Sequence, residues 1–375
     1  MTTQRAAILC AAALAISLNP AGAAPNAADT PRAAWMLGPF AKADDANPIL
    51  KPDPSAAFDC PMTKAKVAWE HDHVFNPAAV VRNGKVYILY RAEDHSGEGI
   101  GHHTSRLGLA ESKDGLRFTK CPTPVLFPDE DDQKANEWTG GCEDPRIVET
   151  EDGGYVLMYT QWNRSVARLA SATSRDLVHW TKHGPVLAKS NGGKFLGVYC
   201  KSGAVVTRRK GDHLIAAKID GKYWMYFGEG SVYAATSTNL TDWDPVLDER
   251  GAWKPLLQTR ANHFDSSLAE SGPPAIITDR GIVFLYNGKN GDQNGDKSIP
   301  AGAYSGGQAL FDAKDPTKLI DRTDGWFITP ERPYETTGQY AAGTVFIEGL
   351  VHFQKKWFLY YGTADSFVAA AVAKE

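Results

Sequence analysis

The sequence Glu143-Asp144-Pro145-Arg146 places two acidic side chains and one basic side chain within four positions. A neighbouring carboxylate raises the pKa of a carboxyl group, whereas a neighbouring guanidinium group lowers it. Both Glu143 and Arg146 therefore act on the proton of Asp144, and a carboxyl group adjusted in this way can serve as a general acid or base. A residue that only began a strand would need no such neighbours. The pattern favours a catalytic role for Asp144.

Other polar residues stand at comparable places, next to apolar stretches that are rich in aromatic residues. Burying a charge at such a place costs free energy unless the charge is paired or functional. Polar residues precede apolar stretches at Asn76, Glu143 and Lys201, and they follow aromatic stretches at Arg91, Glu229 and Asp365. Each also has a structural alternative, for instance a turn cap at Asn76 or an ion pair between Arg91 and Glu93.

These residues fall at matching points of a repeated unit. Five segments each have a small or proline-containing start, an apolar strand, a turn and a second strand that ends in aromatic residues; they begin at 76, 144, 202, 273 and 343. Asn83-Gly84, Asp152-Gly153 and Asp220-Gly221 lie between the paired strands and are typical of hairpin turns. The repeat predicts an all-β fold, specifically a five-bladed β-propeller over residues 60–375. A two-sheet sandwich would leave the repeat unexplained.

A propeller would also bring the polar residues together. The innermost strand of every blade begins near one mouth of the central channel, so the starts of successive units converge there. Ligand sites of folds built from repeated units are expected where such starts meet. We therefore expect a polar site at this mouth.

The composition is that of a soluble, aromatic-rich β protein. The chain has 375 residues, with 10 Trp, 14 Tyr, 15 Phe, 35 Gly and 22 Pro. A disordered chain would lack the aromatic residues, and a helical bundle rarely has so much glycine and proline. The net charge of −4 provides no basic surface for nucleic acid or for an anionic membrane.

The first residues are typical of a Sec-type signal peptide. Arg5 precedes the apolar run 6–18, and Ala21-Gly22-Ala23 forms a small-residue cleavage site. We expect a signal peptide over 1–23, an N-terminal arm over 24–59 and the catalytic propeller over 60–375. The protein would then be periplasmic or secreted. No later segment has 18 consecutive apolar residues, so no membrane anchor is expected.

Four cysteines remain after this segment, namely Cys60, Cys121, Cys142 and Cys200. They show no CxxC pair and no zinc spacing. In an oxidising compartment we expect one or two disulfides, with the connectivity open, rather than a metal site. No DxDxD-type calcium run is present, and neither a metal nor another cofactor is expected.

The sequence resembles glycoside hydrolase family 130, whose members are five-bladed propellers that act on β-mannosides and related glycosides. Matching segments run in the expected order along nearly all of the mature chain. They are Asn76-Pro77, Tyr90-Arg91-Ala92, Gly141-Cys142-Glu143-Asp144-Pro145-Arg146-Ile147, Gly272-Pro273-Pro274 and Tyr360-Tyr361-Gly362-Thr363-Ala364-Asp365.

The resemblance implies roles for several of these residues. Asp144 would be the general acid of a single-displacement, inverting reaction, donating its proton directly or through a substrate hydroxyl. Asn76 and Arg91 would hold the sugar in the −1 subsite, and Asp365 would bind sugar hydroxyls. We also assign to substrate binding the neighbouring or nearby charged residues Glu143, Arg146, Lys201 and Asp265.

The family contains hydrolases and phosphorylases, which differ in the attacking group. Phosphate requires a cage of arginine and lysine side chains. Lys201 stands where phosphorylase relatives also have lysine, but Glu229 stands where the corresponding strand of those relatives leads to arginine. A carboxylate there repels phosphate and can instead orient or deprotonate water. The candidate bases are Glu229, Glu270 and Asp265.

We therefore predict an exported inverting glycosidase that acts on β-mannosides or related oligosaccharides. A β-mannoside phosphorylase and a non-catalytic carbohydrate-binding propeller are the alternatives. A furanoside-cleaving propeller would need an aspartate at the position of Asn76, which disfavours that function. The linkage is left open, and so is the assembly of the chain into a homo-oligomer.

Overall fold

The computed structural model describes residues 32–375, so the predicted signal peptide over 1–23 lies outside the described residues. The described part is all-β, as the sequence predicts. Its helical segments are limited to α1 (Lys134–Glu137), α2 (Pro333–Thr336) and the 3-10 segment η1 (Ser190–Gly193). Within 32–375, no helix is both long enough and apolar enough to cross a membrane.

Most strands fall into five antiparallel groups in chain order. The first is β4 (His73–Arg82), β5 (Lys85–Glu93), β6 (Ser105–Ser112) and β7 (Thr119–Lys120). The second is β8 (Gly141–Glu149), β9 (Tyr155–Trp162), β10 (Ala167–Ser174) and β11 (Trp180–Pro185). The third is β12 (Ala204–Lys210), β13 (His213–Ala216), β14 (Lys218–Ile219), β15 (Lys222–Phe227), β16 (Tyr233–Ser237) and β17 (Asp244–Pro245).

The remaining groups complete the sheet structure. The fourth is β18 (Leu268–Ser271), β19 (Ala275–Thr278), β20 (Gly281–Lys289), β21 (Tyr304–Phe311) and β22 (Leu319–Arg322). The fifth is β23 (Val345–Phe353), β24 (Lys356–Thr363), β25 (Phe367–Lys374) and β1 (Ala41–Lys42). A separate hairpin consists of β2 (Ala57–Cys60) and β3 (Ala65–Ala68).

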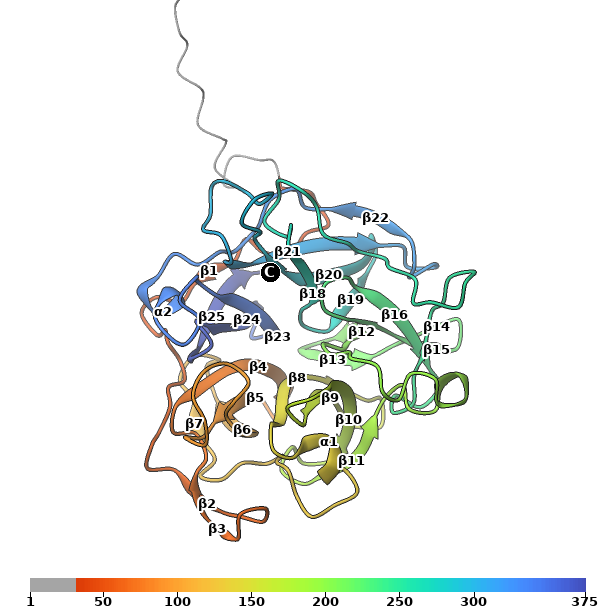
Figure 1. Cartoon of the computed structure of the whole chain (residues 1–375). Coiled ribbons are helices and arrows are strands. Elements are labelled where there is room, and N and C mark those ends of the chain that lie inside the picture. Colours follow the sequence, from red (N-terminus) through yellow and green to blue (C-terminus); the bar gives the residue numbers. More distant parts are fainter. Residues whose placement is uncertain (1–31) are drawn as a thin grey trace, which may run out of the picture. The chain divides into compact units, whose positions relative to one another are not determined.

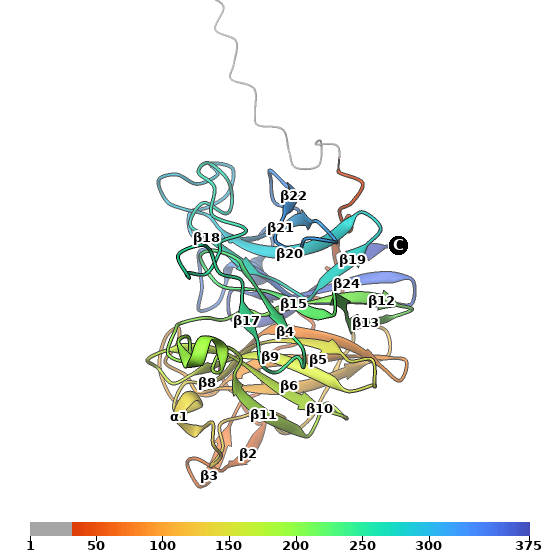
Figure 2. The ribbon, with the colours of Figure 1, turned by 90° about the vertical axis from the view of Figure 1, so that its right-hand side faces the viewer.

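The five groups follow one another around a common centre, near which β4, β8, β12 and β23 lie (Figure 1). In the perpendicular view α1 lies toward one side of the ribbon, and the β12–β13 hairpin lies toward the other (Figure 2). Parallel pairs such as β6–β8 and β12–β19 link neighbouring groups, so the groups are not isolated sheets. The all-β prediction is confirmed, whereas the five-bladed propeller stays a prediction.

Local sequence explains the hairpins inside the groups. Asn83-Gly84 and Asp220-Gly221 have positive φ at both residues, which is the conformation of the two-residue turns that match strand twist. A second turn recurs after β6, β10 and β16. There the hydroxyl groups of Ser112, Ser174 and Ser237 each accept hydrogen bonds from two backbone N–H groups. These side-chain bonds replace strand pairing where the chain changes direction.

Aromatic residues pack between neighbouring groups. Five hydrophobic clusters each combine strands of adjacent groups, and five equivalent tyrosines, each almost completely buried, are Tyr90, Tyr159, Tyr226, Tyr286 and Tyr360. Their hydroxyl groups donate hydrogen bonds to carboxylates or carbonyls outside their own strands. A buried tyrosine hydroxyl needs such a partner. The repeated aromatic strand therefore forms the contacts that hold the groups together.

The part of the arm within the described residues joins the fifth group. β1 pairs with the C-terminal strand β25, and Lys42 extends from β1 to α2. The Nζ atom of Lys42 lies 2.7 Å from Oε2 of Glu335, and both side chains are buried. Glu335 also accepts a hydrogen bond from Tyr361, so that aromatic ring lies in the interior and is not available to stack on a sugar.

The disulfide prediction is wrong. Cys60, Cys121, Cys142 and Cys200 are all free thiols in the described structure. Cys60 lies on the β2–β3 hairpin beside Arg106, whereas Cys142 lies on β8 and is fully buried in an apolar cluster. Cys121 and Cys200 lie in loops, and the packing of the described residues does not bring any two of the four sulfur atoms into bonding distance.

We expect Lys42→Met to destabilise the protein by about 3 kcal/mol, because it leaves the buried Glu335 carboxylate without its cation. Equilibrium denaturation in urea measures this change. Lys66→Met is the matched control, since Lys66 pairs with Asp59 at 3.2 Å on an exposed hairpin. The control should leave the free energy of unfolding nearly unchanged. Equal effects of the two substitutions would contradict a structural role for the buried pair.

Candidate active site

Asn76 and Asp144 occupy equivalent places in β4 and β8. Each has a positive φ, of 48° and 47°, and each precedes a proline within a β-bulge. Pro77 and Pro145 have no N–H group to donate, so the regular ladder is interrupted at both bulges. The bulges turn the two side chains toward each other, and Asn76 Nδ2 donates a hydrogen bond of 2.8 Å to Asp144 Oδ1.

Asp144 is contacted by two cations as well as by Asn76. Arg91 Nη1 lies 3.2 Å from its Oδ1 atom, and Lys201 Nζ lies 3.6 Å from its Oδ2 atom. Burial alone would raise the pKa of Asp144, but Arg91, Lys201, Arg146 and the Asn76 hydrogen bond hold that pKa well below its ordinary value. Asp144 is therefore ionised in the empty site.

Arg91 connects Asp144 to two further carboxylates. Its Nη2 atom lies 2.6 Å from Glu93 Oε1 and 2.9 Å from Glu143 Oε1. The ion pair with Glu93 that the sequence left open is thus present, together with the contact to Asp144. Asp94, the acidic residue next to Glu93, instead pairs with Arg106 at 2.8 Å. Arg91 stands in the centre of three acids rather than in a simple pair.

The pKa of Glu143 is shifted in the opposite direction from that of its neighbour. Burial raises the pKa of Glu143 to about 7, with Asp144 and Glu93 adding to the increase and Arg91 and Lys201 opposing it. Glu143 and Asp144 contact the same guanidinium group, so the two carboxyl groups titrate as a pair. The cations around Asp144 favour Glu143 as the group that takes up the first proton.

Lys201 faces three carboxylates. Its Nζ atom lies 3.6 Å from Asp144 Oδ2, 3.7 Å from Glu229 Oε1 and 3.6 Å from Glu270 Oε1. Burial raises the pKa of Glu270 to about 7, although Lys201 lowers it. Ser202 donates a short hydrogen bond to Glu270. Tyr199 donates one of 2.6 Å to Glu229 Oε2, so both candidate bases are oriented.

Asp365 lies at the turn between β24 and β25, close enough to be affected by the same charges. Burial raises the pKa of Asp365 to about 7, with Glu93 and Asp144 adding to the increase and Arg91 and Lys201 opposing it. Its carbonyl oxygen accepts a hydrogen bond of 2.9 Å from Gln339, which also donates to Glu93. Gln339 thus links this turn to the carboxylates around Arg91.

The contacts of Arg146 indicate a role other than the predicted substrate binding. Its side chain is almost completely buried and donates to the backbone carbonyls of Asp144, Ser271 and Gly272. Its Nη1 atom also lies 2.8 Å from Glu348 Oε1. Because these partners use the guanidinium group, Arg146 positions the backbone of Asp144. These contacts favour a positioning role for Arg146 over the predicted contact with substrate.

Asp265 also differs from its prediction. Arg260 and Arg322 lie 2.8 Å and 2.6 Å from its Oδ2 atom, and Tyr286 donates a hydrogen bond of 2.8 Å to the same atom. Its carboxylate is completely buried and bound by these three side chains rather than by the charges around Asp144. These contacts favour a structural role for Asp265 in the fourth group over the predicted role of a base.

Several site residues were not found from the sequence. Glu348 interrupts the apolar strand β23 and is completely buried, and burial raises its pKa well above the ordinary value. A single charge within a long apolar strand is a signal that could have indicated it. Tyr199 and Gln339 follow no repeated pattern, so only the three-dimensional arrangement reveals their contribution.

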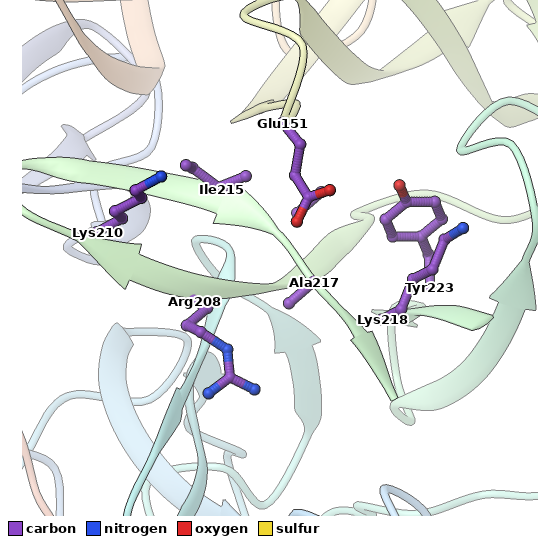
Figure 3. A pocket seen from close by; sticks show the side chains of 8 residues that line it. Glu151, Arg208, Lys210, Ile215, Ala217, Lys218 and Tyr223 are labelled. Carbon is purple, nitrogen blue, oxygen red and sulfur yellow. The ribbon is translucent and has the colours of Figure 1, made fainter. Parts of the chain in front are cut away.

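We use the term acidic cluster for the site as a whole. Its carboxylates are Glu93, Glu143, Asp144, Glu229, Glu270, Glu348 and Asp365, and its cations are Arg91, Arg146 and Lys201. A separate hollow of about 390 Å³ lies among β12, β13 and β15, with Arg208, Lys218 and Tyr223 in its lining (Figure 3). None of the residues that line that hollow belongs to the acidic cluster.

Comparison with known proteins identifies the family. The model of the Glyco_hydro_130 family, described as beta-1,4-mannooligosaccharide phosphorylase, matches residues 40–375. The chain belongs to glycoside hydrolase family 130. The family predicted from the motifs around Asp144 is thereby confirmed, and the acidic cluster is the candidate active site of an enzyme from a mannoside-processing family.

Individual members of family 130 show how similar the chain is to characterised proteins. It is 33% identical to a 1,2-beta-oligomannan phosphorylase of Thermoanaerobacter sp. (strain X514), over 83% of this chain and 93% of the relative. It is 54% identical to a solved glycosyl hydrolase of Bacteroides ovatus, with a TM-score of 0.89 over 90% of this chain and 94% of that one.

A third similarity concerns a structure from a study of family 130 hydrolases. Its authors describe it with the words "The GH130 family of mannoside phosphorylases contains glycoside hydrolases that target beta-1,2 mannosidic linkages in Candida mannan". The chain is 52% identical to it, with a TM-score of 0.90 over 92% of this chain and 98% of that one. Both reaction types therefore occur among the relatives of this family 130 protein.

We expect Glu270→Gln to change how stability depends on pH. The folded protein retains a proton on Glu270 up to a pH of about 7, whereas the unfolded chain releases it near the ordinary pKa of 4.5. The contribution of this carboxyl group is therefore fully present below pH 4.5 and is lost as the pH rises through 7. The amide carries no charge at any pH, so the substitution should become more favourable as the pH rises.

Urea denaturation at pH 5 and at pH 8 measures this effect. Relative to the unsubstituted protein, Glu270→Gln should gain about 1–3 kcal/mol of stability between the two pH values. Glu249→Gln, at an exposed position, is the control and should show no such gain. A difference that stays constant from pH 5 to pH 8 would mean that Glu270 titrates at its ordinary pKa.

Proposed function

We propose that this protein is an exported, inverting glycoside hydrolase that cleaves β-1,2-linked mannosides. One observation carries the choice of hydrolysis, namely the three carboxylates that surround Lys201. A phosphate ion needs cations that are free to bind it, and it would be repelled by Glu229 and Glu270 at this place. Water meets no such repulsion and can donate a hydrogen bond to either carboxylate.

The distances around Lys201 set an upper limit on the separation of the two proposed catalytic carboxylates. Its Nζ atom is 3.6 Å from both Asp144 Oδ2 and Glu270 Oε1, so these oxygens can lie no farther apart than the sum of the two distances. The two carboxyl groups of inverting glycosidases lie roughly 6.5–9.5 Å apart, with room for a water molecule between them, and the limit allows only the lower end of that range. The corresponding upper limit on the distance between Asp144 Oδ2 and Glu229 Oε1 is nearly the same.

Glu270 is the proposed base. A general base works best when its pKa lies near the operating pH, and burial raises the pKa of Glu270 to about 7. Its ionised form would remove a proton from the water that attacks the anomeric carbon. Glu229, held by Tyr199 and Lys201, would orient the same water.

Asp144 is the proposed acid, and it must acquire its proton after the substrate binds. In the empty site the proton that Glu143 and Asp144 retain resides on Glu143, because Arg91, Lys201 and Asn76 stabilise the Asp144 anion. A sugar hydroxyl that takes up one of these contacts would weaken that stabilisation and favour transfer of the proton to Asp144. Asp144 could then protonate the leaving oxygen directly or through a substrate hydroxyl.

The remaining polar groups of the acidic cluster fit the binding of a single sugar ring. Asn76, Arg91 and Asp365 offer an amide, a guanidinium group and a carboxyl group, which can all bond to sugar hydroxyls. They come from β4, β5 and the β24–β25 turn. Their convergence supports the five-bladed propeller, in which successive units meet at one mouth of a channel.

Two further observations support the details of the proposal. The relatives named for a 1,2-linked oligomannan and for β-1,2 mannosidic linkages favour that linkage over β-1,4. The signal-like residues 1–23 favour the periplasm or the exterior of the cell. A phosphorylase outside the cell would release its sugar phosphate away from metabolism. Hydrolysis has no such disadvantage.

A β-mannoside phosphorylase is the second candidate. Lys201 and Arg91 supply two cations next to Asp144, and the Thermoanaerobacter relative is named as a phosphorylase. In that reaction, phosphate would have to displace Glu229 or Glu270 from Lys201. The two reactions consume different co-substrates, so a single experiment separates them.

We expect the purified enzyme to release mannose from β-1,2-mannobiose at the same rate with and without inorganic phosphate. Chromatography that resolves mannose from mannose 1-phosphate measures both products. The mannose from the non-reducing end should be released as the α-anomer, because single displacement inverts a β-linkage. Strict dependence on phosphate, with mannose 1-phosphate as the product, would identify a phosphorylase. β-1,3- and β-1,4-mannobiose are the linkage controls.

We expect Asp144→Asn to lower kcat by roughly 10²–10⁴-fold, the usual contribution of general acid catalysis. Glu270→Gln should lower kcat comparably, and Glu229→Gln should lower it by a smaller factor, since that residue only orients the water. Asp265→Asn tests the opposite assignment and should reduce stability more than kcat per folded molecule. If Glu229→Gln lowered kcat more than Glu270→Gln, then Glu229 would be the base and Glu270 the residue that orients the water. An unchanged kcat in Asp144→Asn would exclude Asp144 as the acid.

A further inference from the structure

Histidine is concentrated in one short part of the chain. His71, His73, His95, His102 and His103 are five of the ten histidines of the sequence. Strand pairing explains why some of them meet, since His73 at the start of β4 lies opposite Glu93 at the end of β5. The segments His71-Asp72-His73 and Glu93-Asp94-His95 therefore run antiparallel at the same end of the first group.

Asp72 lies at the centre of this region. His71 Nδ1 is 2.6 Å from Asp72 Oδ1, and His95 Nδ1 is 3.0 Å from Asp72 Oδ2. His103 Nδ1 lies 3.4 Å from Asp72 Oδ2 but also 2.7 Å from the carbonyl oxygen of Asp94. The rings of His71 and His95 have their centroids 5.0 Å apart. Two imidazoles and one carboxylate thus converge on a small volume.

These three side chains have few other partners. Within the described residues, no arginine or lysine forms an ion pair with Asp72. His95 is exposed, and His71 and Asp72 are partly exposed, so an ion could reach them from solvent. Their ligand atoms all lie within 4.8 Å of one another. A tetrahedral zinc ion holds its ligand atoms roughly 3.4 Å apart, so small side-chain rotations would suffice.

We propose that His71, Asp72 and His95 form a binding site for one divalent transition-metal ion such as Zn²⁺. Imidazole nitrogen and carboxylate oxygen are the ligands that such ions share, whereas Mg²⁺ and Ca²⁺ prefer sets made of oxygen alone. Three protein ligands at a solvent-exposed place leave a coordination position for water. The proposal does not depend on the reaction type proposed above.

A neighbouring group of potential ligands is the less suitable one. His73, Glu93 and His103 are also close together, but both oxygens of Glu93 are already used. Arg91 lies 2.6 Å from Oε1, and Gln339 donates to Oε2 at 2.9 Å. A cation at Glu93 would be repelled by Arg91 and would disturb the carboxylates of the acidic cluster. The site at Asp72 avoids both costs.

Isothermal titration calorimetry of the chelator-treated chain, purified without a histidine tag, tests the proposal. We expect Zn²⁺ to bind with a stoichiometry of one and Mg²⁺ to give no signal. His71→Ala and His95→Ala should each weaken Zn²⁺ binding at least tenfold. His179→Ala is the matched control, since His179 also contacts a carboxylate, that of Asp176, at 2.7 Å but has no second histidine beside it.

Visible absorption of the Co²⁺-loaded protein gives a second measurement. Bands of a four- or five-coordinate ion should appear on titration and should be lost in His95→Ala. A signal that survives in both His71→Ala and His95→Ala would overturn the proposal. So would binding that depends on His103 instead, which would place the ion at Glu93, or binding lost only in Cys121→Ser. Binding weakened equally by His179→Ala would likewise contradict a specific site.

Discussion

The buried Arg91 and the partly buried Lys201 have more carboxylates around them than they can neutralise, and the candidate active site depends on this imbalance. Arg91 contacts Glu93, Glu143 and Asp144, while Lys201 contacts Asp144, Glu229 and Glu270. Only Asp144 touches both cations, and its pKa is lowered, whereas the pKa values of Glu143 and Glu270 are raised to about 7. Buried like charges cannot all ionise together, so the site retains protons at neutral pH. The lowered and the raised pKa values thus arise from a single electrostatic constraint.

The packing of the repeated strands stabilises the fold enough to hold this concentration of charge in place. Positive φ values at Asn76, Asp144 and Ser202 cost about 1–3 kcal/mol each, and they persist only where surrounding structure enforces them. The enforcement comes from apolar clusters between neighbouring groups and from Arg146, which holds the backbone of Asp144 against β18. Each repeated unit therefore has two roles. It supplies a polar residue at its start, and its aromatic strand packs against the neighbouring unit and stabilises that unit.

The sequence predicts the structure well where a pattern repeats. It predicts poorly where side-chain packing alone sets the contacts. The hairpins at Asn83-Gly84 and Asp220-Gly221 follow from turn chemistry, and the meeting of Asn76 with Asp144 follows from equivalent places in the repeat. Asp265 misled the prediction because its partners Arg260 and Arg322 are set by loop geometry. The cysteines misled it because the expected oxidising compartment says nothing about whether two thiols lie within bonding distance.

The pairing of β1 with β25 brings together strands from nearly opposite ends of the chain. During synthesis β1 is made before β25, so the fifth group can be completed only after β25 has emerged. Until then the first group lacks the strands of the fifth group that share its apolar cluster. The order of synthesis therefore makes residues 41–42 wait for the most distant strand of their own sheet.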